Sequence, residues 1–117
     1  MTVQERLKLI VKTLDAKKAE DIQVIEIADL TILTDYFVLA TGTSSTQVKA
    51  LADETEFILG EQGVRPIRTE GYQGASWIVL DYGDIVVHLF YAETRRFYSL
   101  ERLWSDGRHI DTAQFID

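Results

Sequence analysis

The sequence lacks cysteine altogether, and it contains only two histidines and one proline. Without cysteine, the chain can form neither disulfides nor thiolate metal sites. The two histidines, His88 and His109, are fewer nitrogen ligands than a histidine-based metal site normally uses. A single proline and the absence of a long polar tract argue against a disordered chain. We therefore expect a folded protein that holds no metal and no cofactor.

The chain also lacks a hydrophobic run long enough for a signal peptide or a membrane span. Charged residues occur throughout Met1 to Leu14, where the apolar stretch of a secretory signal would lie. Elsewhere, every apolar run without a charge is far shorter than the roughly 20 residues that cross a bilayer as a helix. We therefore expect a cytoplasmic protein without a membrane partner.

Basic side chains are outnumbered by acidic ones, with 12 lysines and arginines against 19 aspartates and glutamates, and the formal net charge is −7. Nucleic-acid binding draws much of its affinity from basic side chains that replace phosphate counterions. The adjacent basic pairs in the sequence are Lys17–Lys18 and Arg95–Arg96. Because acids outnumber bases, we expect contact with nucleic acid to be peripheral at most. An acidic surface instead favours a basic partner and speeds the encounter with it.

The hydrophobic periodicity predicts alternating helices and strands within one domain. Capping boxes at Thr2–Glu5 and Ser44–Gln47 begin two of the helices. The predicted helices cover 2–15, 44–59 and 93–104, and the predicted strands cover 22–27, 35–41, 65–68, 76–81 and 84–90. This order predicts an α/β fold with a mixed sheet of about five strands and helices mainly on one face. The domain is expected over 1–106, with a C-terminal tail over 107–117.

The clearest hairpin joins the runs 76–81 and 84–90 through a two-residue turn at Tyr82–Gly83. One face is then wholly aliphatic and should meet the helices. The other face carries Trp77, Val79, Asp81, Asp84, Val86, His88 and Phe90. Aromatic residues surrounded by carboxylates are typical of the centre and rim of a protein interface. The same pattern also fits side chains that pack on a neighbouring loop or on the last predicted helix, and the sequence leaves both alternatives open.

A possible chemical site lies at the junction 41–45, which leads from a predicted strand into a helix and offers backbone N–H groups to an anion. The lysine of a P-loop and a G-x-G-x-x-G motif are missing, so a tight turn with a helix cap is the favoured interpretation. A nucleotidyltransferase also needs paired carboxylates on the next strand to hold metals, whereas Asp53, Glu54 and Glu56 fall within a predicted helix. No serine lies in a nucleophile elbow. An enzyme with a nucleotide at this junction remains the alternative to a non-catalytic interaction protein.

Several spaced motifs agree, in their order, with one known family. They are Asp35–Ser45, Gln47–Val48, Ala52–Asp53, Glu70–Gly71, Trp77–Asp81, Gly83–Asp84, Val86–His88 and Arg95–Trp104. Together they resemble the ribosomal silencing factor family RsfS, also called Iojap. The resemblance covers about residues 1–106.

The resemblance implies binding to ribosomal protein L-fourteen on the intersubunit face of the large ribosomal subunit. Bound there, the protein would block joining of the small subunit and repress translation under nutrient limitation. It also implies a fold similar to the nucleotidyltransferases, without their catalytic acids. With the hairpin face, it predicts a docking patch of Trp77, Val79, Val86, His88, Phe90 and Tyr91, with rim acids Glu70, Asp81 and Asp84. An exposed apolar patch could also serve a homodimer of the free protein.

Overall fold

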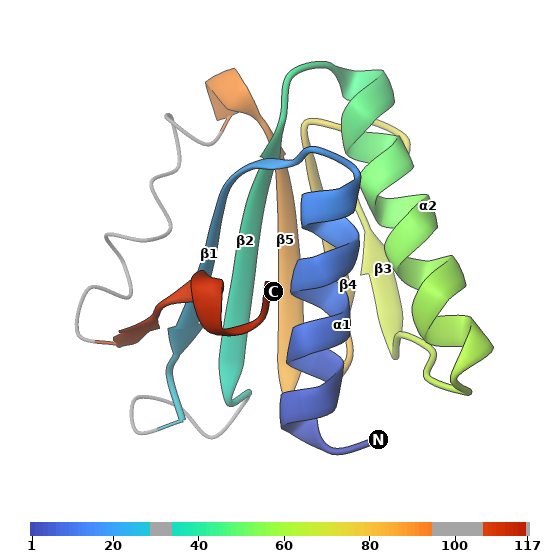
Figure 1. Cartoon of the computed structure of the whole chain (residues 1–117). Coiled ribbons are helices and arrows are strands. Elements are labelled where there is room, and N and C mark those ends of the chain that lie inside the picture. Colours follow the sequence, from blue (N-terminus) through green and yellow to red (C-terminus); the bar gives the residue numbers. More distant parts are fainter. Residues whose placement is uncertain (29–33, 95–106, 117) are drawn as a thin grey trace.

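The structure is a computed structural model that describes residues 1–28, 34–94 and 107–116 (Figure 1). Six strands form one mixed sheet in the order β3-β4-β5-β2-β1-β6. The strands are β1 Glu20–Glu26, β2 Tyr36–Gly42, β3 Arg68–Glu70, β4 Trp77–Asp81, β5 Ile85–Tyr91 and β6 Arg108–Ile110. Among these described strands, β2 and β5 pair in parallel and all other neighbours are antiparallel. The predicted mixed α/β sheet is confirmed, with one strand more than expected.

Two long helices, α1 Val3–Ala16 and α2 Ser45–Glu61, lie side by side on one face of the sheet (Figure 1). Thr2 and Glu5 form the reciprocal capping box that the sequence predicted for α1. Ser44 caps α2 by accepting a hydrogen bond from the Gln47 N–H, but the Gln47 side chain turns to Thr43 and does not complete a box. The helix expected over 93–104 falls mostly outside the described residues.

The main hydrophobic core fills the space between the two helices and the sheet. β2 is buried along its whole length, as its apolar sequence predicted for a central strand. Side chains that alternate along β4 and β5 point into this core together with the apolar stripes of the helices; they include Ile78, Leu80, Val87, Leu89, Leu7, Ile10, Val48 and Leu51. A second cluster lies on the opposite face of the sheet and consists of Ile25, Ile27, Phe37, Leu39 and Phe90.

The hairpin between β4 and β5 turns one residue later than predicted. The Tyr82 N–H donates to the Ile85 carbonyl at 2.9 Å, so Gly83 and Asp84 form the turn, and Trp77 lies opposite Phe90 instead of His88. The cause is local. The Asp81 carboxylate accepts a hydrogen bond from the Gly83 N–H at 2.8 Å, and Gly83 adopts a positive φ of 90°, which suits glycine at the first turn position.

Residues 107–116, which belong to the segment 107–117 expected to be a tail, contribute to the fold. β6 pairs with β1 and places Ile110 opposite Val24. A short 3-10 helix over Thr112–Gln114 follows, and Phe115 after it is buried in the main core. The sheet therefore ends in a three-residue strand on both sides, β3 at one edge and β6 at the other.

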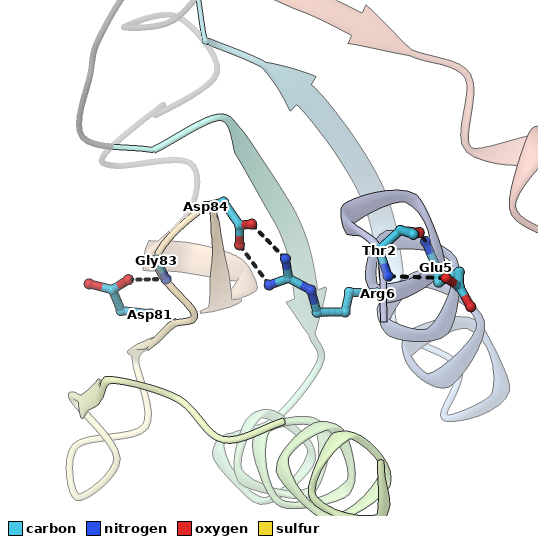
Figure 2. A network of polar contacts seen from close by, with 6 residues as sticks. All are labelled: Thr2, Glu5, Arg6, Asp81, Gly83 and Asp84. Carbon is cyan, nitrogen blue, oxygen red and sulfur yellow. Dashed lines mark hydrogen bonds and ion pairs between the residues drawn. The ribbon is translucent and has the colours of Figure 1, made fainter. Parts of the chain in front are cut away.

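An ion pair ties the first turn of α1 to the β4–β5 turn (Figure 2). The Arg6 guanidinium donates to both carboxylate oxygens of Asp84, at 2.6 and 2.5 Å. These two hydrogen bonds lower the pKa of Asp84 below its usual value. The backbone carbonyl of Asp84 also accepts the N–H groups of Asp35 and Tyr36 at the start of β2, each at 3.0 Å. Asp84 thus joins a helix, a turn and the central strand.

We predict that D84N lowers the free energy of unfolding by about 1–2 kcal/mol at neutral pH, because it removes a partly buried, two-bonded ion pair. The pKa of Asp84 is depressed in the folded protein, so this contribution is present above the unfolded pKa and is lost as the pH falls through about 4 and below. Urea titrations at pH 7 and pH 3 measure the loss of stability at neutral pH and its disappearance in acid. Adding R6Q to D84N should lower the free energy of unfolding little further, because the ion pair is already lost. If the losses of the two single variants added up in the double variant at pH 7, the pairing would be contradicted.

Candidate protein-docking site

The candidate site is the face of β3, β4 and β5 that points away from the helices. Side chains directly opposite one another in a sheet share a face. Glu70 lies opposite Val79, which lies opposite His88. Trp77 lies opposite Phe90, and Asp81 lies opposite Val86. Because the turn comes one residue later than predicted, each residue of β4 faces a residue of β5 two positions further along. A shift of two positions keeps side chains on the same face, so the predicted hairpin face keeps its members, apart from Asp84 in the turn.

Exposure divides these residues into side chains that solvent reaches and side chains that are buried. Trp77, Val79, Asp81 and Val86 are half-buried, and Glu70 on the edge strand is exposed. His88 is 7% exposed and Phe90 is fully buried. Both belong to β5, which is flanked by β4 and β2, and their rings lie beside Phe37 and Trp77. The prediction that His88 and Phe90 form part of an accessible patch is therefore wrong, and a smaller set of side chains remains available.

Trp77 is held by the rings beneath and beside it. Its indole N–H donates to Nδ1 of His88 at 3.0 Å, and its ring stacks on Phe90 with 5.3 Å between centroids. Phe37 meets the imidazole edge-on at 4.7 Å. Beside the strand, directly after β3, Gly71 has a φ of 78°, and any side chain there would collide with the Trp77 carbonyl oxygen. Both the backbone and the ring of Trp77 are thus confined.

His88 is a neutral acceptor in this arrangement. Burial lowers its pKa to about 4, with a small opposing effect of the nearby Asp81 charge. Because Nδ1 accepts a hydrogen bond from Trp77, the proton of the neutral ring resides on Nε2. Nε2 is buried and has no hydrogen-bond partner in the described part of the chain. The single expected hydrogen bond is confirmed, but the residue is more deeply buried than the half-buried position that the strand pattern indicated.

The rim acids differ in how far they are already engaged. Asp81 lies 3.5 Å from the Arg68 guanidinium and also accepts the Gly83 N–H. Glu70 lies 3.8 Å from Arg68, in a pair that is largely exposed on both sides. Sequence reasoning missed Arg68, since nothing in its spacing pairs it with Asp81, which lies on another strand. The rim is therefore two acids that share one arginine, with a net negative charge.

The last two predicted site residues lie elsewhere. Asp84 binds Arg6 on the helix side of the sheet, so it is not a free rim acid. Tyr91 follows Phe90 in a strand, and its side chain therefore points to the opposite face. There it packs against the main core and lines a hollow near the start of α2. Asp84 and Tyr91 therefore do not lie on the face of the sheet that carries Trp77.

That hollow, of about 410 Å³, lies where the alternative nucleotide site was considered. It is lined by Thr43, Ser44, Ser45, Gly74, Ala75, Ser76 and Tyr91. Local capping already engages polar groups of the junction, because Oε1 of Gln47 accepts both the backbone N–H and the hydroxyl of Thr43. In the described ranges, no three His, Asp or Glu side chains gather in a way that could hold a metal ion. The same ranges contain no helix long and apolar enough to cross a membrane.

We predict that His88 makes the protein sensitive to acid between pH 6.5 and about 4. The folded pKa is depressed, so the unfolded chain takes up the proton first and stability falls as the pH falls through this window. The expected loss is about 3 kcal/mol relative to an H88L variant, which cannot titrate. Urea titrations at several pH values measure the difference. The free energy of unfolding of H109Q, which lacks an exposed histidine, should fall with pH as that of wild type does. If the free energy of unfolding of H88L depended on pH as steeply as that of wild type, the prediction would be refuted.

Comparisons with known proteins agree on one family. The family model described as "Ribosomal silencing factor during starvation" matches residues 1–117. "Ribosomal silencing factor RsfS" of Halalkalibacterium halodurans is 39% identical over 116 residues, which is 99% of both chains. A crystal structure of a Chromobacterium violaceum protein is similar with a TM-score of 0.87 and 38% identity, over 90% of this chain and 88% of that one.

A more distant relative is the mouse protein "Mitochondrial assembly of ribosomal large subunit protein 1", which is 32% identical over 85% of this chain and 45% of its own length. The family model covers every residue of the chain, including the segment 107–117. The resemblance inferred from the spaced motifs is confirmed: the chain belongs to the ribosomal silencing factor family.

Proposed function

We propose that this protein silences translation by binding ribosomal protein L-fourteen on the intersubunit face of the large ribosomal subunit. Bound there, it blocks joining of the small subunit when nutrients are limiting. Membership of the ribosomal silencing factor family supports the silencing role, and the description of the family model names starvation. The name of the mouse relative, which concerns the ribosomal large subunit, supports the choice of subunit.

The observation that carries the proposal is a half-buried, aromatic-centred surface on the face of the sheet opposite the helices. We define the docking patch as Trp77, Val79 and Val86, with Glu70 and Asp81 as its acidic rim. Tryptophan is among the residues most enriched at binding hot spots, and apolar centres with polar rims are typical of interfaces. The rim suits a basic partner, as does the net charge of −7.

On this proposal the protein acts by occupying a surface, without catalysis and without a cofactor. Its place of action is the cytoplasm, where ribosomes are. Contact with ribosomal RNA is peripheral, because the chain has fewer basic than acidic residues. A homodimer of the free protein that buried the apolar part of the docking patch would compete with ribosome binding.

We predict that W77A weakens binding to purified large subunits by at least about 2 kcal/mol, roughly thirtyfold, because it removes the aromatic centre of the patch. The matched control is F57A, which truncates an aromatic side chain that is 61% exposed on α2. F57A should bind as wild type does. Cosedimentation with separated subunits, together with thermal melting of each variant, gives affinity and fold integrity on the same samples.

Wild-type protein should sediment with large subunits and leave small subunits free. Equal binding to both subunits, or to neither, would sink the proposal. A W77A variant that is folded and binds normally would remove Trp77 from the interface while leaving the choice of subunit untouched. Saturable binding of a nucleotide by the purified protein would favour the alternative site at 41–45 instead.

We predict that E70Q and D81N slow association with L-fourteen and flatten its dependence on salt, with a smaller effect on dissociation, because rim charges act mainly on the encounter. Asparagine at 81 keeps an oxygen that can accept the Gly83 N–H, so the turn is preserved. E61Q removes an exposed acid at the end of α2 and is the charge-matched control. Stopped-flow association at low and physiological salt measures the rates; equal slowing by all three variants would point to net charge alone.

A further inference from the structure

We infer that His88 is a positioning residue, which fixes the indole of Trp77 in the orientation that a docking partner meets. The two side chains lie on adjacent strands: His88 on β5 lies opposite Val79, which is two residues after Trp77 on β4. The indole N–H donates to Nδ1 of His88 at 3.0 Å. This inference rests on the proposed docking role of Trp77, and it assigns a role to a residue that is itself too buried to touch a partner.

The position of the imidazole is set by its surroundings and not by Trp77 alone. Phe37 on β2 meets the ring edge-on at 4.7 Å, and the Phe90 ring lies nearly parallel to it at 6.2 Å. Phe90 also stacks under Trp77. Phe90 is fully buried and Phe37 is 9% exposed, so both are held by packing. The acceptor on Nδ1 is therefore presented from a rigid support, which is what a positioning group requires.

A histidine at this place carries a cost that an apolar residue would avoid. Its Nε2–H is buried with no partner among the described residues, and an unmade hydrogen bond of a buried donor is unfavourable. Its ring is also desolvated. Leucine would fill a similar space without either penalty. The feature that leucine cannot supply is the acceptor for the Trp77 indole, so the orientation of Trp77 is what the histidine contributes.

Fixing the indole before binding favours docking, because a free tryptophan side chain would have to be ordered when the partner arrives. The hydrogen bond to His88 and the stack on Phe90 restrict two different motions of the ring. The stack confines its plane, and the hydrogen bond determines which edge turns inward. The opposite edge and outer ring face are then presented in one arrangement.

Two substitutions at position 88 test the inference. H88L removes the acceptor, whereas H88N keeps an oxygen at a distance from the backbone similar to that of Nδ1. We expect H88L to melt no lower than wild type at pH 7 and yet to bind large subunits about tenfold more weakly, or 1.4 kcal/mol. H88N should restore most of the affinity. A purely structural role predicts the reverse for H88L, with a lower melting temperature and unchanged affinity below it.

Hydrogen exchange of the Trp77 indole N–H, followed by NMR, reports positioning without any ribosome. The signal is identified by its loss in W77F. Exchange should be slow in wild type and H88N and faster in H88L; rapid exchange in wild type would overturn the inference even if H88L fails to fold. In a W77F background, H88L should weaken docking no further. If W77F itself leaves docking intact, the docking role of Trp77 fails; if W77F weakens docking but H88L does not, only the positioning role fails.

Discussion

The parallel pairing of β2 with β5 is the constraint on which the rest of the structure depends. It brings together two segments more than 40 positions apart in the chain, Tyr36–Gly42 and Ile85–Tyr91, and a parallel pair requires a long crossover between its strands. That crossover contains α2, β3 and β4. Since β2 is buried along its whole length, both faces of the sheet centre must be covered. Helices α1 and α2 cover one face, and the second hydrophobic cluster, which includes Phe37 and Phe90, lies on the other.

This constraint explains why the candidate site grades from buried to exposed across neighbouring strands. His88 and Phe90 on β5 lie next to the sheet centre and share its burial. Trp77 and Val79 on β4 are one strand further out and half-buried, and Glu70 on β3 reaches solvent. Distance from the centre of the sheet thus contributes to the exposure of these side chains, although Val86, near the turn on β5, is half-buried.

The sequence predicted the features that depend on period and local chemistry. The helix starts at Thr2 and Ser44, the buried β2 and the division of the hairpin into two faces all follow from side chains close in sequence. The hairpin register was wrong by two residues because the Asp81 carboxylate selects a later turn, yet an even shift leaves the faces unchanged. The error therefore changed the predicted face only at Asp84, which lies in the turn.

What could not be predicted depends on contacts between distant residues. Arg6 and Asp84 are 78 positions apart, so no local pattern marked Asp84 as paired. β6 has three residues and no period to detect. Burial of His88 and Phe90 follows from the order of the strands in the sheet. That order depends on contacts between distant residues, which the pattern of a single sequence does not reveal. The candidate patch was accordingly drawn too wide, and it also included Tyr91 from the opposite face.

The two edges of the sheet have a consequence for how the protein meets other chains. An open edge with unpaired backbone groups can template the addition of a foreign strand, and natural proteins limit this with short, charged edges. Here both edges are three residues long, and they carry Arg68 and Glu70 on one side and Arg108 on the other. Such short ribbons offer few backbone hydrogen bonds to an incoming strand. In the proposed docking, recognition therefore depends on side chains on the face of the sheet, and the short edges disfavour self-association by strand addition.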